Sequence, residues 1–363
     1  MQAHFSLKHF SRLMGSYGLY QHADTYNPLL SEGYCTDDNA RAVQLLVHLV
    51  PLLTGSQRLE AENFLAACWQ FLRDAQVTPG SYINFRDVDG RWLPRKSESE
   101  DMYARVARCC VEVIIHDTNV QRCREARQML DSLVERVGRF TAPRAWAETL
   151  IAWSAFVEAG EAPKYVRGLQ EKGYKALVGL WQSNAASTWP WFEPVMTYAN
   201  ALFLHALLRL TPKPDGNIQD IILEEGASFL IASTIRDNMF IPIGSDGWYA
   251  KAGKPSLNNQ QPIEAGLMFD WLLDYYRLYP DRVSDEQVAA PYLWFFGHNT
   301  GKVALADIKE GASYDGLFTV GVNKHRGAES MLAYLWTEIL LVKAPVEIRG
   351  YIEAENKRIG AET

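Results

Sequence analysis

Apolar residues recur along most of the chain at helical spacing, and segments of two kinds alternate. One kind is apolar on most faces and rich in alanine and aromatic residues; these segments begin near residues 37, 100, 146, 193, 261 and 327. The other kind has one charged face and covers residues 4–14, 56–73, 119–137, 163–181, 218–233 and 285–296, with a polar helix expected at 345–358. A helix that is apolar all round is buried, whereas an amphipathic one is wetted on one side. The alternation therefore predicts an all-α fold, an (α/α)6 toroid of six inner and six outer helices, with residues 1–363 as a single domain.

The connections between these helices are unequal in length. Those from an inner helix to the next outer helix are short, whereas most of those in the other direction are long and rich in glycine, aromatic and acidic residues. Parts of the long loops, such as 83–86 and 317–322, could form short strands. Long loops gathered at one end of a rigid scaffold usually carry function, so the site is expected at that mouth of the toroid.

Two consecutive carboxylates open the first inner helix. Thr36 is suited to be its N-cap, which places Asp37 and Asp38 in the first turn, where the helix dipole favours negative charge. Adjacent buried carboxylates repel each other unless one of them is capped, protonated or paired with a cation. A catalytic pair and a helix cap with an arginine partner are equally good interpretations of this pattern.

Other acids are expected at the same mouth. Glycoside cleavage needs two carboxyl groups, one to protonate the leaving oxygen and one to activate water or attack the sugar. A carboxylate in a first helical turn is more often a capping group, so each acid alone is weak evidence. The full set of catalytic candidates is Asp37, Asp38, Glu100, Asp101, Glu264 and Asp315.

Aromatic residues are interleaved with these acids. Aromatic rings that stack on sugar C–H faces, beside groups that bond hydroxyls, would form a carbohydrate pocket. Trp189 and Trp191 flank Pro190 and could instead only fix the start of a helix. The candidate substrate-binding residues are Tyr34, Arg41, Trp92, Trp189, Trp191, Asp246, Trp248, Tyr249, Gln261 and His325.

Composition and charge narrow the classes of partner. The formal net charge of -7 gives no support for binding to nucleic acid or to an anionic membrane, and no apolar run is long enough to span one. The five cysteines form no CxxC pair, and the N-terminus lacks the apolar core of a signal peptide, so a cytoplasmic location is expected. Metal-binding HxxxH or HExxH spacing and phosphate-binding glycine motifs are absent, so neither a metal nor a cofactor is predicted.

Three short segments resemble a known family. Residues 19–23 (LYQHA), 33–42 (GYCTDDNARA) and 261–265 (QPIEA) are similar to the signature of a helical domain associated with bacterial glycosyltransferase-like proteins and with polysaccharide-utilisation or synthesis loci. The resemblance covers about residues 19 to 336, and that domain resembles the six-hairpin glycosidase superfamily. It implies an acidic pair at the mouth of the inner helices, an oligosaccharide or glycan as ligand, and a glycosyltransferase as a candidate partner. This chain contains no nucleotide-sugar-binding glycosyltransferase domain.

Three functions follow from these observations. The first is a glycoside hydrolase in which Asp38 is the base or nucleophile partner, with an inverting mechanism preferred because the acids would lie across a wide mouth. The second is a sugar epimerase or isomerase, which would need a proton shuttle from His22, His298 or His325. The third is a non-catalytic glycan-binding module that works beside a glycosyltransferase.

Overall fold

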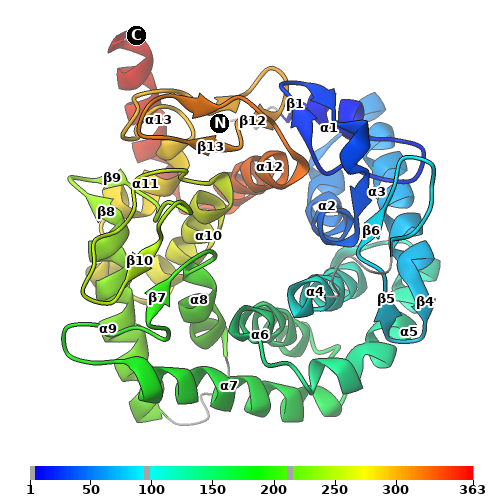
Figure 1. Cartoon of the computed structure of the whole chain (residues 1–363), viewed down its shortest axis with the longest axis horizontal. Coiled ribbons are helices and arrows are strands. Elements are labelled where there is room, and N and C mark those ends of the chain that lie inside the picture. Colours follow the sequence, from blue (N-terminus) through cyan, green and yellow to red (C-terminus); the bar gives the residue numbers. More distant parts are fainter. Residues whose placement is uncertain (1–4, 94–98, 211–215, 363) are drawn as a thin grey trace.

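The computed structural model describes residues 5–93, 99–210 and 216–362, and it forms a double ring of helices (Figure 1). The inner ring consists of α2 (Thr36–Leu49), α4 (Glu100–His116), α6 (Pro143–Glu158), α8 (Ala201–Arg209), α10 (Pro262–Leu278) and α12 (Ala328–Lys343). The outer layer consists of α3 (Gly55–Ala75), α5 (Val120–Val137), α7 (Tyr165–Asn184), α9 (Gly216–Thr234), α11 (Asp285–Trp294) and α13 (Val346–Glu362). The predicted all-α (α/α)6 toroid is confirmed.

Packing closes the inner ring. Each inner helix packs against the next one along the chain, and α12 returns to pack against α2. The outer helices α3, α5, α7, α9 and α11 each pack on the inner helix that precedes them, and α13 packs on α11. A short helix, α1 (Lys8–Leu13), packs against α12. The inner helices are buried on both sides, as their apolar sequences predict; Trp153 of α6 and Trp271 of α10 are almost wholly inaccessible to solvent.

The strands of the described residues form seven two-stranded antiparallel sheets, all in connections that precede an inner helix. The pairs are β1 (Ala23–Asp24) with β2 (Asn27–Pro28), β3 (Tyr34–Cys35) with β6 (Phe85–Arg86), β4 (Gln76–Thr78) with β5 (Ser81–Tyr82), β7 (Val195–Met196) with β10 (Tyr249–Ala250), β8 (Ile235–Arg236) with β9 (Met239–Phe240), β11 (Ala306–Asp307) with β12 (Ala312–Ser313), and β13 (Gly316–Leu317) with β14 (Val322–Asn323). Three short 3-10 helices, η1 (Leu30–Glu32), η2 (Val50–Leu52) and η3 (Pro280–Arg282), complete the described elements. The expected short strands therefore lie in the long loops, at the end of the ring where the inner helices begin.

The largest error in the predicted boundaries concerns the fourth inner helix. It was expected from residue 193, but α8 begins at Ala201, because residues 195–196 pair with β10 and Ala199 adopts a left-handed φ of 51°. Glu193 therefore lies in a loop, where its carboxylate pairs with Arg144 at 2.8 Å. The second inner helix begins at Glu100, where it was expected, and residues 94–98 before it lie outside the described residues. None of the described helices is long and apolar enough to cross a membrane.

Candidate functional site

The first turn of α2 is fixed by groups from several segments. Its N-cap is Cys35 and not Thr36 as predicted; the Cys35 Sγ accepts a hydrogen bond from the backbone N–H of Asp38. The Thr36 hydroxyl instead donates to the Ile83 carbonyl at 2.7 Å, next to β6. The buried Asn39 side chain accepts from the backbone N–H of Leu19 at 2.9 Å. These bonds fix the first turn of α2 without using the carboxylate oxygens of Asp37 and Asp38 as caps.

Asp37 faces a cation. One oxygen accepts from Arg105 of α4 at 2.8 Å, and the other accepts from the Asn84 amide at 3.2 Å. Burial opposes ionisation of Asp37, but the guanidinium groups of Arg105 and Arg41 and the two hydrogen bonds outweigh it, so its pKa lies below the ordinary value. Asp37 is therefore a carboxylate at neutral pH.

The pKa of Asp38 is shifted in the opposite direction. Its side chain is buried, with the residue only 7% exposed, and its oxygens contact the Cys35 thiol at 3.1 Å and Arg41 at 3.3 Å. Burial raises the pKa of Asp38, and the carboxylates of Glu329 and Asp37 raise it further, while Arg41 opposes them. Consecutive residues of one helical turn thus have pKa values pushed in opposite directions.

Arg41 connects α2 to the last inner helix. Its guanidinium donates to Glu329 of α12 at 2.6 Å as well as to Asp38. Burial opposes ionisation of Glu329, but Arg41 and Arg105 lower its pKa below the ordinary value. The mouth therefore holds alternating cations and anions contributed by α2, α4 and α12.

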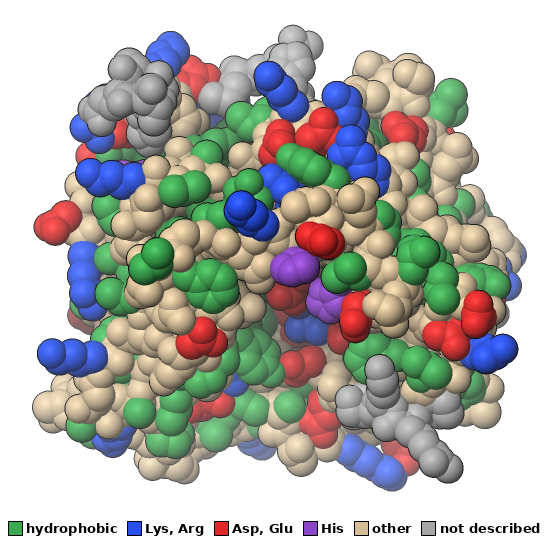
Figure 2. Space-filling view, turned by 45° about the horizontal axis from the view of Figure 1, so that its top comes forward, with side chains coloured by type: hydrophobic (Ala, Val, Ile, Leu, Met, Phe, Trp, Pro, Cys, Tyr) green, Lys and Arg blue, Asp and Glu red, His purple; other side chains and the backbone are tan. Residues whose placement is uncertain are grey.

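Two adjoining cavities open inside the ring. The outer one, of about 340 Å³, is lined by Asp37, Asp38 and Asp315, and the inner one, of about 380 Å³, extends between the inner helices. Four residues line both cavities: Arg41, Arg105, Gln261 and Glu329. Figure 2 shows this hollow with acidic and basic side chains inside it and histidine side chains at its edge.

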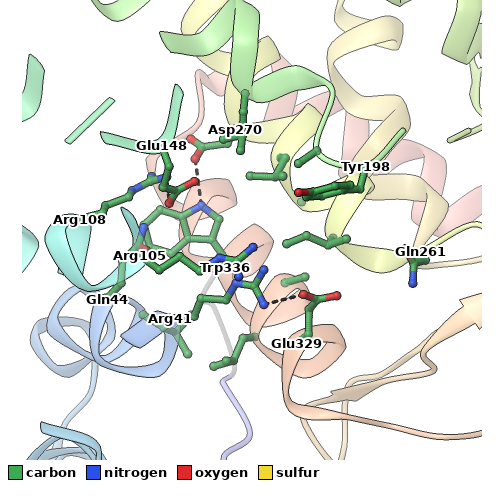
Figure 3. A pocket seen from close by; sticks show the side chains of 18 of the residues that line it. Arg41, Gln44, Arg105, Arg108, Glu148, Tyr198, Gln261, Asp270, Glu329 and Trp336 are labelled. Atoms are coloured by element: carbon green, nitrogen blue, oxygen red, sulfur yellow. Dashed lines mark hydrogen bonds and ion pairs between the residues drawn. The ribbon is translucent and has the colours of Figure 1, made fainter. Parts of the chain in front are cut away.

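The inner cavity is lined by polar groups that the sequence-based candidates did not include (Figure 3). Arg108 donates to Glu148 at 2.8 Å, and the Trp336 indole N–H donates to Asp270 at 3.1 Å. Tyr198 lies across the cavity from them. The available signal was a polar side chain inside an otherwise apolar inner helix, since such a group is costly to bury unless it is paired or serves a ligand.

Six of the sequence-predicted site residues line these cavities. They are Asp37, Asp38, Asp315, Arg41, Trp248 and Gln261. Asp315 accepts from the backbone N–H of Gly327 at 2.6 Å, and burial raises its pKa. Residues from α2, the loop before α10 and the loop before α12 therefore line the mouth, whereas the predicted acid Glu264 lines neither cavity.

The other predicted acids contact neighbouring backbone or side chains. Glu100 accepts from the backbone N–H groups of Thr141, at 2.7 Å, and Ala142, at the start of α6. Glu264 is buried and accepts from the backbone N–H of Ala199; burial raises its pKa to about 7. Asp101 accepts from the hydroxyl of Tyr198 at 2.7 Å, so it contacts a residue that lines the inner cavity.

Most of the predicted aromatic platforms pack against protein. Tyr34, Trp189 and Trp191 are buried in the core. Tyr34 stacks on Tyr20, Trp92 packs against Phe71, and Tyr249 packs edge-on against Trp189. None of these five predicted residues is among those that line the two cavities described above. The exposed Asp246 accepts from the Asn258 amide at 2.9 Å.

Two of the three candidate histidines lie near the outer cavity. His22 lines it, and the Nδ1 of His325 contacts the Ala23 carbonyl at 2.9 Å. Both histidines are close enough to Asp315 to lower its pKa, although burial dominates. His298 follows α11, and its pKa is lowered by burial.

Comparisons with known proteins give fold similarity without a sequence family. No protein-family model matches the chain, and no curated protein matches it. Cellobiose 2-epimerase from Bacillus thermoamylovorans is similar in structure, with a TM-score of 0.67 and 11% identity over 93% of this chain and 96% of that chain. A family 76 glycoside hydrolase from a bovine Bacteroides thetaiotaomicron strain has a TM-score of 0.61 and 8% identity over 93% of this chain and 76% of that chain.

A third similar structure is an α-1,6-mannanase of Salegentibacter, with a TM-score of 0.55 and 12% identity over 92% of this chain and 95% of that chain. It is an inactive variant in which two consecutive aspartates are replaced by asparagine, in complex with α-1,6-mannotriose. At these identities the likeness is one of fold: the chain shares the (α/α)6 toroid of these carbohydrate-active enzymes.

Proposed function

We propose that this protein is a glycoside hydrolase that cleaves an oligosaccharide bound in the two adjoining cavities. The observation that carries the proposal is the opposite perturbation of Asp37 and Asp38 at the cavity wall. A glycosidase needs one carboxyl group protonated and one ionised at the same pH, and environments that push two pKa values apart supply both. The inactive consecutive-aspartate variant of the similar mannanase supports the same pair here.

The environments of the two carboxyl groups favour roles that differ from the sequence-based hypothesis, in which Asp38 was the base or nucleophile. Asp38, with its raised pKa, is the general acid that donates its proton to the leaving glycosidic oxygen. Asp37, held ionised by Arg105, is the nucleophile that attacks the anomeric carbon as the glycosidic bond breaks. Asp38, now a carboxylate, then takes a proton from a water that displaces Asp37 and so regains its acid form.

This assignment favours retention over the inverting mechanism preferred from sequence. Retaining enzymes hold their two carboxyl groups about 5 Å apart, whereas inverting enzymes separate them by roughly 6.5–9.5 Å to admit a water. We assign Asp37 and Asp38, which are consecutive residues of one turn, to the closer arrangement. The inner cavity, with Tyr198, Asp270 and Trp336, then holds the sugar on one side of the cleaved bond.

The charge of the cavities fits a neutral substrate. The cations Arg41, Arg105 and Arg108 are each paired with a carboxylate, at distances of 2.6–2.8 Å. Paired groups have unused lone pairs and N–H bonds for sugar hydroxyls but offer little net charge to an anionic ligand. The expected glycosyltransferase partner and the cytoplasmic location stay predictions.

The proposal is tested by incubating wild type, Asp37→Asn and Asp38→Asn with manno-, gluco- and galacto-oligosaccharides and separating the products by chromatography. Shorter oligosaccharides from wild type alone support the hydrolase. If wild type cleaves none of the panel, or if both variants cleave at the wild-type rate, the proposal is wrong.

A sugar epimerase is the second candidate, favoured by the placement of His22 and His325 near Asp315. Epimerisation needs a group that removes a proton from one face of a carbon and a group that returns it to the other. The same incubations separate the two functions. An epimerase would convert a disaccharide to an isomer of equal mass, with activity lost in His22→Ala, whereas a hydrolase would release monosaccharide.

A further inference from the structure

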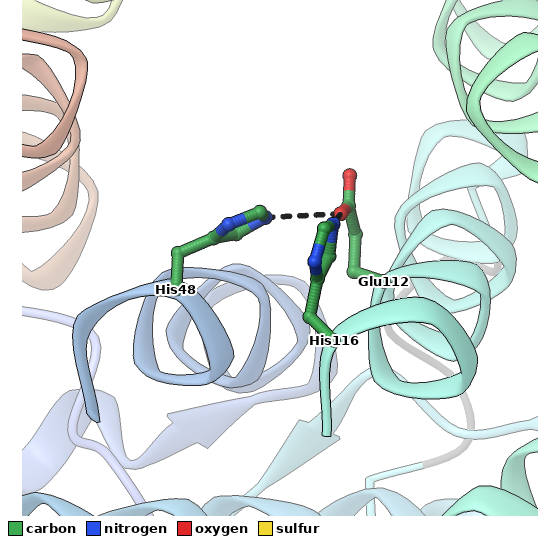
Figure 4. A group of neighbouring side chains, drawn as sticks. All are labelled: His48, Glu112 and His116. Carbon is green, nitrogen blue, oxygen red and sulfur yellow. Dashed lines mark hydrogen bonds and ion pairs between the residues drawn. The ribbon is translucent and has the colours of Figure 1, made fainter. Parts of the chain in front are cut away.

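A second cluster of functional side chains lies at the opposite end of the ring, outside the proposed active site. His48 is in the last turn of α2, and Glu112 and His116 are in the last turns of α4 (Figure 4). His48 lies eleven residues after Asp37 on the same helix, or about 16 Å along its axis at 1.5 Å per residue. The cluster is therefore separate from the two carboxylates proposed for catalysis.

The three side chains converge on one point. The Nε2 atoms of His48 and His116 lie 3.0 Å and 3.4 Å from the same oxygen of Glu112. All three candidate ligand atoms lie within 4.8 Å of one another. Ligands of a tetrahedral zinc ion with bonds of about 2.0–2.1 Å are roughly 3.3 Å apart, so small side-chain rotations would bring these atoms onto one ion.

The chemistry and access of the cluster also suit a metal. Two imidazoles and one carboxylate are a ligand set that zinc uses, with the fourth position left to water. The side chains of His48 and Glu112 are only 10% and 9% exposed, which excludes competing water, while that of His116 is 38% exposed and opens the site to solvent. We propose that His48, Glu112 and His116 bind one divalent transition-metal ion of the zinc type, which ties the ends of α2 and α4 together.

Two cations near the cluster affect this proposal. Arg108 lies 3.7 Å from the other oxygen of Glu112 and is already paired with Glu148 at 2.8 Å, so it leaves the oxygen that faces the histidines free. Lys343 lies 3.2 Å from Nδ1 of His48, the ring nitrogen opposite the metal-facing one. A metal on Nε2 leaves the ring proton on Nδ1, so the ammonium of the exposed Lys343 must turn into solvent. Lys343 therefore weakens metal binding without blocking it.

No metal-binding motif is visible along the chain because the ligands are divided between two helices. Glu112 and His116 are four residues apart on one helical face, but the third ligand comes 64 residues earlier in the chain. Only the packing of α2 against α4 joins them. The cluster adjoins the wall of the inner cavity, since Trp336 of that wall packs edge-on against His48 at 5.2 Å.

The test is isothermal titration of ZnCl2 into protein freed of metal with a chelator, for wild type, His48→Asn, His116→Ala and the control His325→Ala, which removes a histidine from the opposite end. We expect one equivalent to bind wild type and the control alike. Binding should weaken by about a hundredfold or more in His48→Asn and His116→Ala, because even the loss of a group that only supports a ligand costs 10–100-fold. Lys343→Met should bind zinc at least as tightly as wild type.

Thermal unfolding gives a second readout that does not depend on enzyme activity. At a hundredfold excess over the dissociation constant, ZnCl2 should raise the Tm of wild type by about 2–5 °C and leave that of His116→Ala unchanged. MgCl2 should shift neither, because magnesium prefers oxygen ligands. Absence of saturable zinc binding to wild type, or equal binding by wild type and His116→Ala, would overturn the proposal.

Discussion

The acids at the start of α2 and those at the starts of α4 and α10 share one sequence pattern but have different surroundings. Asp37 and Asp38 line a cavity, while Glu100 and Glu264 accept hydrogen bonds from backbone N–H groups that precede α6 and α8. Both α2 and α4 have a side-chain N-cap, Cys35 and Ser99, so their acids differ in the donors that surround them and not in capping. A carboxylate at a helix start is therefore available for chemistry only where nearby backbone donors have another acceptor.

The largest effect that tests this comparison is the loss of either α2 acid. Asp37→Asn and Asp38→Asn should each lower kcat/KM for oligosaccharide cleavage by about 10³-fold, because each would remove the proposed nucleophile or the proposed proton donor. Glu100→Gln is the matched control, since it changes an acid at the start of the neighbouring inner helix and should keep most of the activity. A comparable loss in Glu100→Gln would remove the distinction between the two groups of acids.

The second effect concerns stability. Burial raises the pKa of Glu264 from 4.5 to about 7, so the folded protein holds a proton that the unfolded chain releases above pH 4.5. The stabilisation is complete below pH 4.5 and is lost as the pH rises through 7, by about 3 kcal/mol. Urea unfolding at pH 4.5 and pH 8 should show wild type losing that much relative to Glu264→Gln, which cannot titrate. Parallel pH dependences for the two proteins would contradict a buried, protonated Glu264.

The third effect is on the pH profile. Arg105 holds the pKa of Asp37 down, so Arg105→Met should raise that pKa and move the acidic limb of the kcat/KM profile to higher pH. Activity at the optimum should fall by about tenfold, because the nucleophile also loses a positioning hydrogen bond. A drop in activity with an unmoved acidic limb would show that Arg105 does not control the ionisation of Asp37.

The smallest effect is expected in the inner cavity. Trp336→Phe keeps an aromatic ring but removes the N–H that bonds Asp270. Loss of one such hydrogen bond, about 1 kcal/mol, should raise KM roughly fivefold with little change in kcat. Steady-state kinetics on the cleaved oligosaccharide measures both constants, and an unchanged KM would place the substrate elsewhere.

The fold could be predicted from the sequence because burial and exposure alternate along it, as apolar α6 and amphipathic α5 illustrate. The start of α8 could not be predicted from the sequence. Residues 195–196 are extended because they pair with β10, which comes some 50 residues later in the chain. The site was partly predictable: Asp37 and Asp38 stand out as adjacent acids, but Glu100 and Glu264 look the same until their backbone donors are known. Asp270 and Trp336 could not be identified from the sequence, because they lie on different helices. Only the packing of α10 against α12 brings them into the hydrogen bond that places both at the cavity wall.

We propose that Asp37 and Asp38 cleave a glycosidic bond, with Asp37 as the nucleophile. The most direct measurement is an NMR time course of an oligosaccharide that the wild-type protein cleaves, which records the anomeric configuration of the first product. Our account predicts that the product appears first with the configuration of the substrate and that Asp37→Asn releases none. First appearance of the opposite anomer, or unchanged release by Asp37→Asn, would contradict it.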